Sequence, residues 1–201
     1  MNMRYFVTVV LFIASMTGAK AKNNISVDYT EESELVSVIA HLAKVPGYIW
    51  PEEQAGVIDY FHQVDSTFAP YSNHPIMAFV ADSLVKQGFG YHVPVAMALR
   101  LKLKNGKLHY NTDLETDFNH YYRGITPQHE KKLIALLEDF YKKARFHSFF
   151  KKNQPLYNAC KQAMQQQLVD KIDLDWYKSF FGPINNISFH IYLGLLKGHS
   201  N

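Results

Sequence analysis

The sequence has little cysteine, glycine or proline. Cys160 is its only cysteine, so no disulfide can form within the chain. It lies in LYNACKQAM among helix-forming residues, which favours a small buried apolar group over a nucleophile. Only 10 glycines and 8 prolines occur in 201 residues, and no repeat, low-complexity tract or linker is present. With 47% hydrophobic residues, the sequence predicts a folded chain with a core and not a disordered one.

The usual short catalytic motifs are also missing. There is no G-x-S-x-G, no phosphate-binding loop and no dinucleotide-binding fingerprint. The 10 histidines include no pair at H-x-H or H-x-x-x-H spacing, at which neighbouring side chains can hold one metal ion. A metal site could still be assembled from distant segments, but no local spacing predicts one.

Positive and negative side chains nearly balance. The formal net charge is +3, and Arg4 and Lys20 lie in the first 21 residues, which hold no acid. Residues 22–201 therefore carry a net charge of only +1. A nearly neutral surface lacks the positive potential that would attract a nucleic acid or an anionic membrane. We expect no nucleic-acid partner.

An apolar stretch lies at the start of the chain. Arg4 precedes an apolar stretch from Phe6 to Ala14, and Ala19-Lys20-Ala21 follows as an A-x-A cleavage site. These three parts are typical of an export signal, and a buried N-terminal helix is the alternative. The run is shorter than the roughly 20 residues that span a bilayer, so we expect no transmembrane anchor. The sequence predicts a signal peptide over 1–21, a periplasmic or secreted protein, and a single mainly helical domain over 22–201.

Hydrophobic periodicity predicts a mainly α chain with a few strands, an α+β fold. Apolar residues recur at helical spacing, with capping residues before them, over 31–45, 51–64, 75–87, 91–101, 114–122, 127–143, 155–168 and 174–181. Alternation predicts short strands over 25–29 and 187–196. Asn105-Gly106 predicts a hairpin in which Leu101 and Leu103 lie opposite Leu108 and Tyr110.

Residues 129–133 read HEKKL, which invites comparison with the H-E-x-x-H helix of zinc peptidases. Thr126 and Pro127 are typical of an N-cap and a first helical turn, so His129 would lie near the helix start. The position of the second zinc ligand is Leu133, which falls in an apolar stripe. The helix dipole accounts for an acid near the N-terminus. We interpret HEKKL as a capped helix start and not as a metal site.

Three polar residues form a weak candidate metal site. Asp113, Asp117 and His120 share one face if 114–122 is helical. Two carboxylates with an imidazole can hold a divalent ion. A calcium loop does not fit, because Phe118 stands where that loop needs glycine. A solvated polar face is the preferred interpretation.

Aromatic residues supply weak candidates for a substrate groove. We single out His74, Tyr91 and Trp176, although His74 precedes Pro75 and is expected to enter a helix. Four aromatic residues near the end of the chain have helical spacing, which is more typical of a core: Trp176, Tyr177, Phe180 and Phe181. If exposed, they would favour a non-catalytic exported binding module for a peptide or glycan.

Several stretches, taken in order, resemble an exported bacterial family of unknown function found largely in Bacteroides-type organisms. The similarity covers nearly all of 27–201 and is carried by ESELVSVIAHLA, YFHQVDSTFAPYSNHPIMAFVADSLVKQGFGY, PVAMALRL, FYKKARFHSFFKKNQPLY, DLDWYKSFFG and SFHIYLGLLKGHSN. Its most specific anchors are His74-Pro75, Asp175-Trp176 and Phe181-Gly182. None of these anchors is a catalytic motif.

Members of that family are similar to gluzincin-like metallopeptidases, with an H-E-x-x-H-type helix beyond the segment that LGLLKGHSN resembles. The resemblance implies a truncated chain, the helical N-terminal portion of a larger gluzincin-like fold without its C-terminal metal-binding part. No catalytic or metal-binding residue carries over, and zinc is expected only in a full-length member. The chain alone would be inactive, its partner would be a peptide or protein substrate, and a degenerate, poorly folding product is another possibility. Because the sequence offers few partners for the strand over 187–196, we expect self-association through an unpaired C-terminal strand.

Overall fold

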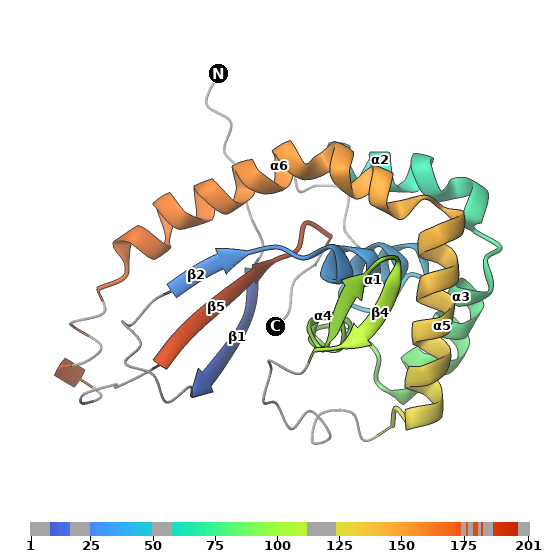
Figure 1. The fold of residues 1–201 in the computed structure, drawn as a ribbon, viewed down its shortest axis with the longest axis horizontal. Coiled ribbons are helices and arrows are strands. Elements are labelled where there is room, and N and C mark those ends of the chain that lie inside the picture. Colours follow the sequence, from blue (N-terminus) through green and yellow to red (C-terminus); the bar gives the residue numbers. More distant parts are fainter. Residues whose placement is uncertain are drawn as a thin grey trace.

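The computed structural model describes residues 9–16, 25–49, 58–111, 124–173, 176, 179–180, 182 and 187–196. The fold is mainly helical with a few short strands, which confirms the α+β class. Figure 1 shows a helical body beside a small sheet, with the long helix α6 (Phe146–Gln167) passing over both. The described helices are α1 (Glu31–Leu42), α2 (Ile58–Phe68), η1 (Ala69–Tyr71), α3 (Pro75–Ala78), η2 (Phe79–Leu84), η3 (Val85–Gln87), α4 (Val93–Leu99), α5 (Pro127–Lys143), α6 and η5 (Val169–Lys171).

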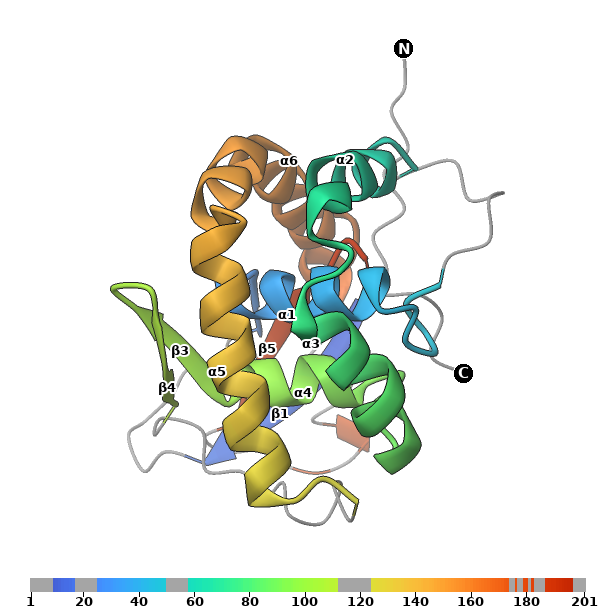
Figure 2. The ribbon, with the colours of Figure 1, turned by 90° about the vertical axis from the view of Figure 1, so that its right-hand side faces the viewer.

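Helix α1 is the central helix of the helical body. Figure 2 shows it with α2 and α6 on one side and α4 on the other. The Thr30 side chain accepts a hydrogen bond from the Ser33 backbone N–H, as its position before three acidic residues predicts. Leu35, Val38 and Ile39 are fully buried, so the predicted apolar stripe of α1 faces the core.

Phenylalanine side chains join α2, α5 and α6. The Phe68 ring lies 5.6 Å from the Phe140 ring and 4.9 Å from the Phe149 ring, measured between centroids. Phe146 stacks on Phe68 at 5.9 Å with an interplanar angle of 20°. Aromatic pairs at these separations add about 0.5–1.5 kcal/mol each beyond the burial of their area.

Helix α6 begins nine residues earlier than the sequence pattern predicted, at Phe146 and not near Pro155. The prediction placed the start at Pro155 because a proline inside a helix removes one N–H and crowds the carbonyl four residues before it. That prediction was wrong. Burial of the residues ahead of Pro155 outweighs that cost, since Phe146, Phe149 and Phe150 all lie in the core. Tertiary packing thus overrides the local preference.

The hairpin is formed as predicted. Strands β3 (Leu101–Lys104) and β4 (Lys107–Tyr110) pair with Leu101 opposite Tyr110 and Leu103 opposite Leu108. Asn105 and Gly106 have φ angles of 51° and 73°. Positive φ at both central residues is the requirement of a type I′ turn, which Asn-Gly satisfies at little cost.

A second sheet has the order β1-β5-β2 and contains strands from both ends of the described chain. Strand β2 (Ile25–Asp28) runs parallel to β5 (Ile187–Leu193), and β1 (Val9–Met16) runs antiparallel to it. The predicted C-terminal strand is therefore central in this sheet, not unpaired as expected. Because β1 lies wholly within 1–21, that edge of β5 becomes open only if the expected signal peptide is removed.

Candidate functional site

The first turn of α1 carries three glutamates, each bound to a different element. The Glu31 carboxylate accepts a hydrogen bond from the Tyr141 hydroxyl at 3.0 Å and lies 2.9 Å from His147 Nδ1. The Glu32 carboxylate accepts the backbone N–H of Leu103 in β3. The helix dipole also favours acids in this turn.

Glu34 is the third of these acids, and it is buried with 4% of its surface exposed. Its Oε1 accepts a hydrogen bond from the Tyr60 hydroxyl at 2.5 Å, and the backbone of Leu195 provides a further hydrogen bond. The Tyr60 and Tyr157 hydroxyls lie 2.6 Å apart. Removal of the carboxylate from water raises the pKa of Glu34 from 4.5 to about 7, although both hydrogen bonds act in the opposite direction.

The surroundings of Glu34 hold their other titratable groups in the neutral form. Burial, followed by the nearby Glu34 charge, raises the pKa values of both Tyr60 and Tyr157 well above the usual range for a phenol. Burial also raises the pKa of the Cys160 thiol to about 11. Since the thiolate is the nucleophile, Cys160 is unreactive at neutral pH, in agreement with its predicted role as a buried apolar group. Burial thus leaves a carboxyl of raised pKa in the core, among phenol and thiol groups that stay protonated.

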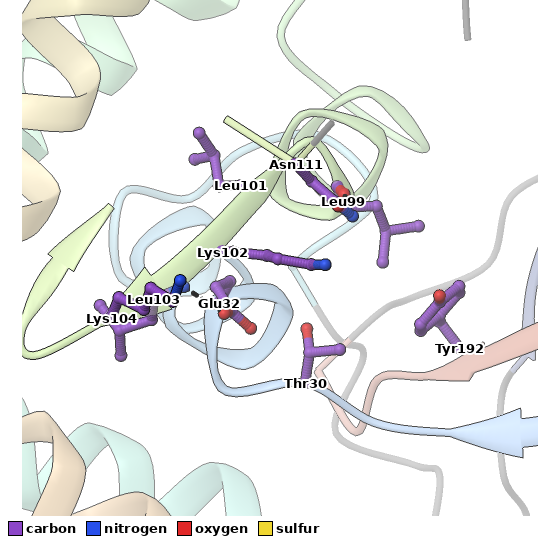
Figure 3. A pocket seen from close by; sticks show the side chains of 9 residues that line it. All are labelled: Thr30, Glu32, Leu99, Leu101, Lys102, Leu103, Lys104, Asn111 and Tyr192. Carbon is purple, nitrogen blue, oxygen red and sulfur yellow. Dashed lines mark hydrogen bonds between the residues drawn. The ribbon is translucent and has the colours of Figure 1, made fainter. Parts of the chain in front are cut away.

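A cavity of about 350 Å³ opens between the start of α1, the hairpin and the sheet. Figure 3 shows its lining, which comes from α1, α4, β3, β5 and the segments beside them: Thr30, Glu32, Leu99, Leu101, Lys102, Leu103, Lys104, Asn111 and Tyr192. This volume lies at the lower end of the range for small-molecule sites. The cavity thus lies between the helical body and the sheet.

The cavity offers apolar surface with a few polar groups. In Figure 3, the Lys102 side chain extends across the open space, and the Tyr192 ring stands on the opposite side. Burial, followed by the Asp28 charge, raises the pKa of Tyr192, so its hydroxyl stays protonated and can donate. The Thr30 hydroxyl accepts from Ser33 N–H, which leaves its own O–H to donate. This set suits a ligand with an apolar group and hydrogen-bonding oxygens.

The three residues suggested for a groove lie in three different places. His74 is buried as the N-cap of α3: its Nδ1 accepts from Ile76 N–H at 3.3 Å, and its Nε2 is 3.0 Å from Asp139 Oδ2. Nδ1 thus caps α3 itself, and Nε2 connects the start of α3 to Asp139 in α5. Tyr91 is 55% exposed in the segment before α4, where its N–H donates to the Pro46 carbonyl. Neither residue lines the cavity.

Trp176 and Phe180 contradict the core interpretation of the late aromatic residues. Their exposed fractions are 52% and 68%, and their rings stack at 5.4 Å between centroids with an interplanar angle of 12°. The Trp176 backbone N–H donates to Asp173 Oδ1. The prediction failed for these two residues because helical spacing does not indicate whether the rest of the protein covers the face that the rings share. Tyr177 and Phe181 lie outside the described residues.

The HEKKL segment is a capped helix start, as predicted. Thr126 Oγ1 accepts from His129 N–H at 3.3 Å, and His129 Nδ1 accepts from Thr126 N–H at 3.4 Å. Leu133 is buried, where a zinc helix would need its second histidine. The candidates Asp113, Asp117 and His120 lie outside the described residues. Within the part of the chain that the structure describes, no three His, Cys, Asp or Glu side chains are grouped so that they could hold a metal ion.

The residues around Glu34 and those of the cavity were not among the candidates predicted from the sequence. Glu34 lies four residues before the buried Val38 and so shares its helix face, and that spacing was the available sign that its carboxylate enters the core. Lys102 and Tyr192 were placed correctly on their strands, but nothing local indicated that these strands border one cavity.

No protein-family model, no curated protein and no solved structure matches this chain. Among the described helices, none combines the length and the apolar character needed to cross a membrane.

Proposed function

We propose that this chain is the non-catalytic, helical part of an exported peptidase-like protein and that its cavity binds a segment of a peptide or protein. The observation that carries the binding role is the cavity of about 350 Å³ with its mixed lining. Leucine side chains offer an apolar surface to a ligand side chain, and Lys102, Asn111 and Tyr192 offer polar groups to a peptide backbone. The export signal and the family resemblance support the location and the class of ligand.

The test measures peptide binding by the exported chain. Fluorescein-labelled peptides from a casein digest are titrated with the protein, and fluorescence anisotropy gives the dissociation constant. Lys102→Met keeps the apolar stem and removes the ammonium, and we expect it to weaken binding about tenfold, or ~1.4 kcal/mol. Lys152→Met is the matched control, since Lys152 is exposed on α6 and does not line the cavity. Equal peptide affinities of Lys102→Met and Lys152→Met would contradict peptide binding in this cavity.

The stacked pair Trp176–Phe180 favours glycan binding as a second candidate. An exposed aromatic face can pack against the apolar face of a sugar ring, and these two rings form a parallel stack. Retention on insoluble starch, chitin or cellulose, lost in Trp176→Ala and kept in Lys102→Met, would support this function. Retention that persists in Trp176→Ala would contradict it.

A further inference from the structure

One edge of β5 is paired with β1, which lies inside the segment proposed to be an export signal. β1 covers this edge in antiparallel register from Met16↔Ile187 to Val9↔Leu193, with a shift between Val9 and Phe12. The whole of β1 lies inside the segment that the proposed export removes. Removal of 1–21 therefore takes away the strand that now pairs with this edge.

The edge would then be well suited to pair with another strand. β5 reads ISFHIYL and contains no Lys, Arg, Asp, Glu or Pro, the residues with which natural edge strands prevent pairing. Two kinds of contact hold β5 in place. Its Ile191 and Leu193 side chains are buried, and β2 pairs with its other edge from Ile25↔Phe189 to Asp28↔Tyr192. A fixed, uncharged strand is a template for strand addition.

We propose that, once 1–21 is removed, β5 of a second copy takes the place of β1 and forms a dimer with a continuous sheet β2-β5-β5-β2. β1 already shows that this edge accepts an apolar strand in antiparallel sense. Antiparallel pairing of β5 with itself keeps that sense and generates a closed two-fold interface. No Lys, Arg, Asp or Glu of β5 would meet its own copy, because the strand contains none. The inference rests on the proposed export, and in it β1 covers the edge of β5 until the signal is removed.

The consequence for His190 gives a sharp test. His190 lies near the middle of β5, where a two-fold axis brings it close to His190 of the second copy. His190→Lys or His190→Glu should place like charges across the axis, so each variant alone should be monomeric. A mixture of the two should form a heterodimer, because opposite charges then face each other. Loss of the contact between His190 Nδ1 and the Ser26 hydroxyl is common to both variants and cannot explain such a rescue.

The experiment uses light scattering coupled to size exclusion on the exported chain, with mass spectrometry of the same sample. We expect Lys22 as the first residue, a dimer for the wild type, monomers for each variant and a heterodimer for the mixture. A monomeric wild type that begins at Lys22 would overturn this inference alone. An exported sample that keeps 1–21 would overturn the proposed signal removal and the inference together. Variants that stay dimeric, or monomers that the mixture does not rescue, would also contradict the assigned edge.

Discussion

The Tyr60 hydroxyl and Glu34 Oε1 lie 2.5 Å apart inside the core, which places a carboxyl of raised pKa between α1 and α2. A buried carboxyl is costly when it is charged and much less costly when it is protonated. Stability of the fold should therefore depend on pH near neutrality, where most proteins vary little.

The first prediction concerns Glu34. Its pKa is about 7 in the folded chain and 4.5 ordinarily, so the folded state binds the proton more tightly. The free energy of unfolding should fall as the pH rises from 4.5 to about 7, by roughly 3 kcal/mol from this group, and then level off. Glu34→Gln, which cannot ionise, should remove that slope and be more stable than wild type at pH 8. Urea unfolding at several pH values measures this, and parallel pH profiles for the two proteins would contradict it.

Glu138 should behave with the opposite sign. It is partly buried, yet hydrogen bonds from Lys107 Nζ at 2.7 Å and Leu108 N–H at 2.9 Å lower its pKa below 4.5. Its contribution is fully present above pH 4.5 and is lost as the pH falls through the lowered value. We expect Glu138→Gln to be less stable than wild type at pH 7, with a difference that shrinks in acid. A difference that grows on acidification would contradict the assignment.

The HEKKL interpretation can be tested by comparison with the core. His129→Ala should cost about 1 kcal/mol or less, because it removes one half of a capping box. Leu137→Ala should cost roughly 2–5 kcal/mol, because Leu137 is fully buried. Thermal unfolding gives both values, and elemental analysis should show the same metal content in His129→Ala as in wild type. A loss of bound zinc in that variant would reverse the interpretation.

The purified chain should have no peptidase activity and should contain less than one zinc per molecule. Zinc catalysis needs ligands that leave one coordination position open for water, with a base beside it. We expect no cleavage of unfolded casein with or without added zinc. Proteolysis by a homogeneous sample that a chelator abolishes would contradict this and direct attention to Asp113, Asp117 and His120.

Local chemistry made part of the fold predictable. The Asn105-Gly106 turn fixed the hairpin register, and Thr126 fixed the start of α5, because each signal acts on backbone within a few residues. The start of α6 was not predictable, since a local rule about Pro155 was outweighed by burial against other helices.

The candidate sites depend on segments that are distant in the sequence. Glu34 is hydrogen-bonded to Tyr60 and to the backbone of Leu195, and Tyr60 is in turn hydrogen-bonded to Tyr157. A single sequence does not state which of these segments meet. The lining of the cavity likewise combines residues that are far apart in the sequence, such as Thr30, Asn111 and Tyr192. Polar residues beside a buried stripe can be recognised in advance, but their partners cannot.

The parallel pairing of β2 with β5 also sets an order of folding. The two strands are separated by residues 29–186, so their contact forms only after β5 has been synthesised. Closing so long a loop is entropically costly, and topologies with distant contacts fold slowly, whereas the α5–α6 and hairpin contacts are close in sequence. The sheet should thus be the last part to assemble. For a chain that passes through a membrane channel unfolded this delay would be useful, because the sheet cannot close before β5 has also passed through.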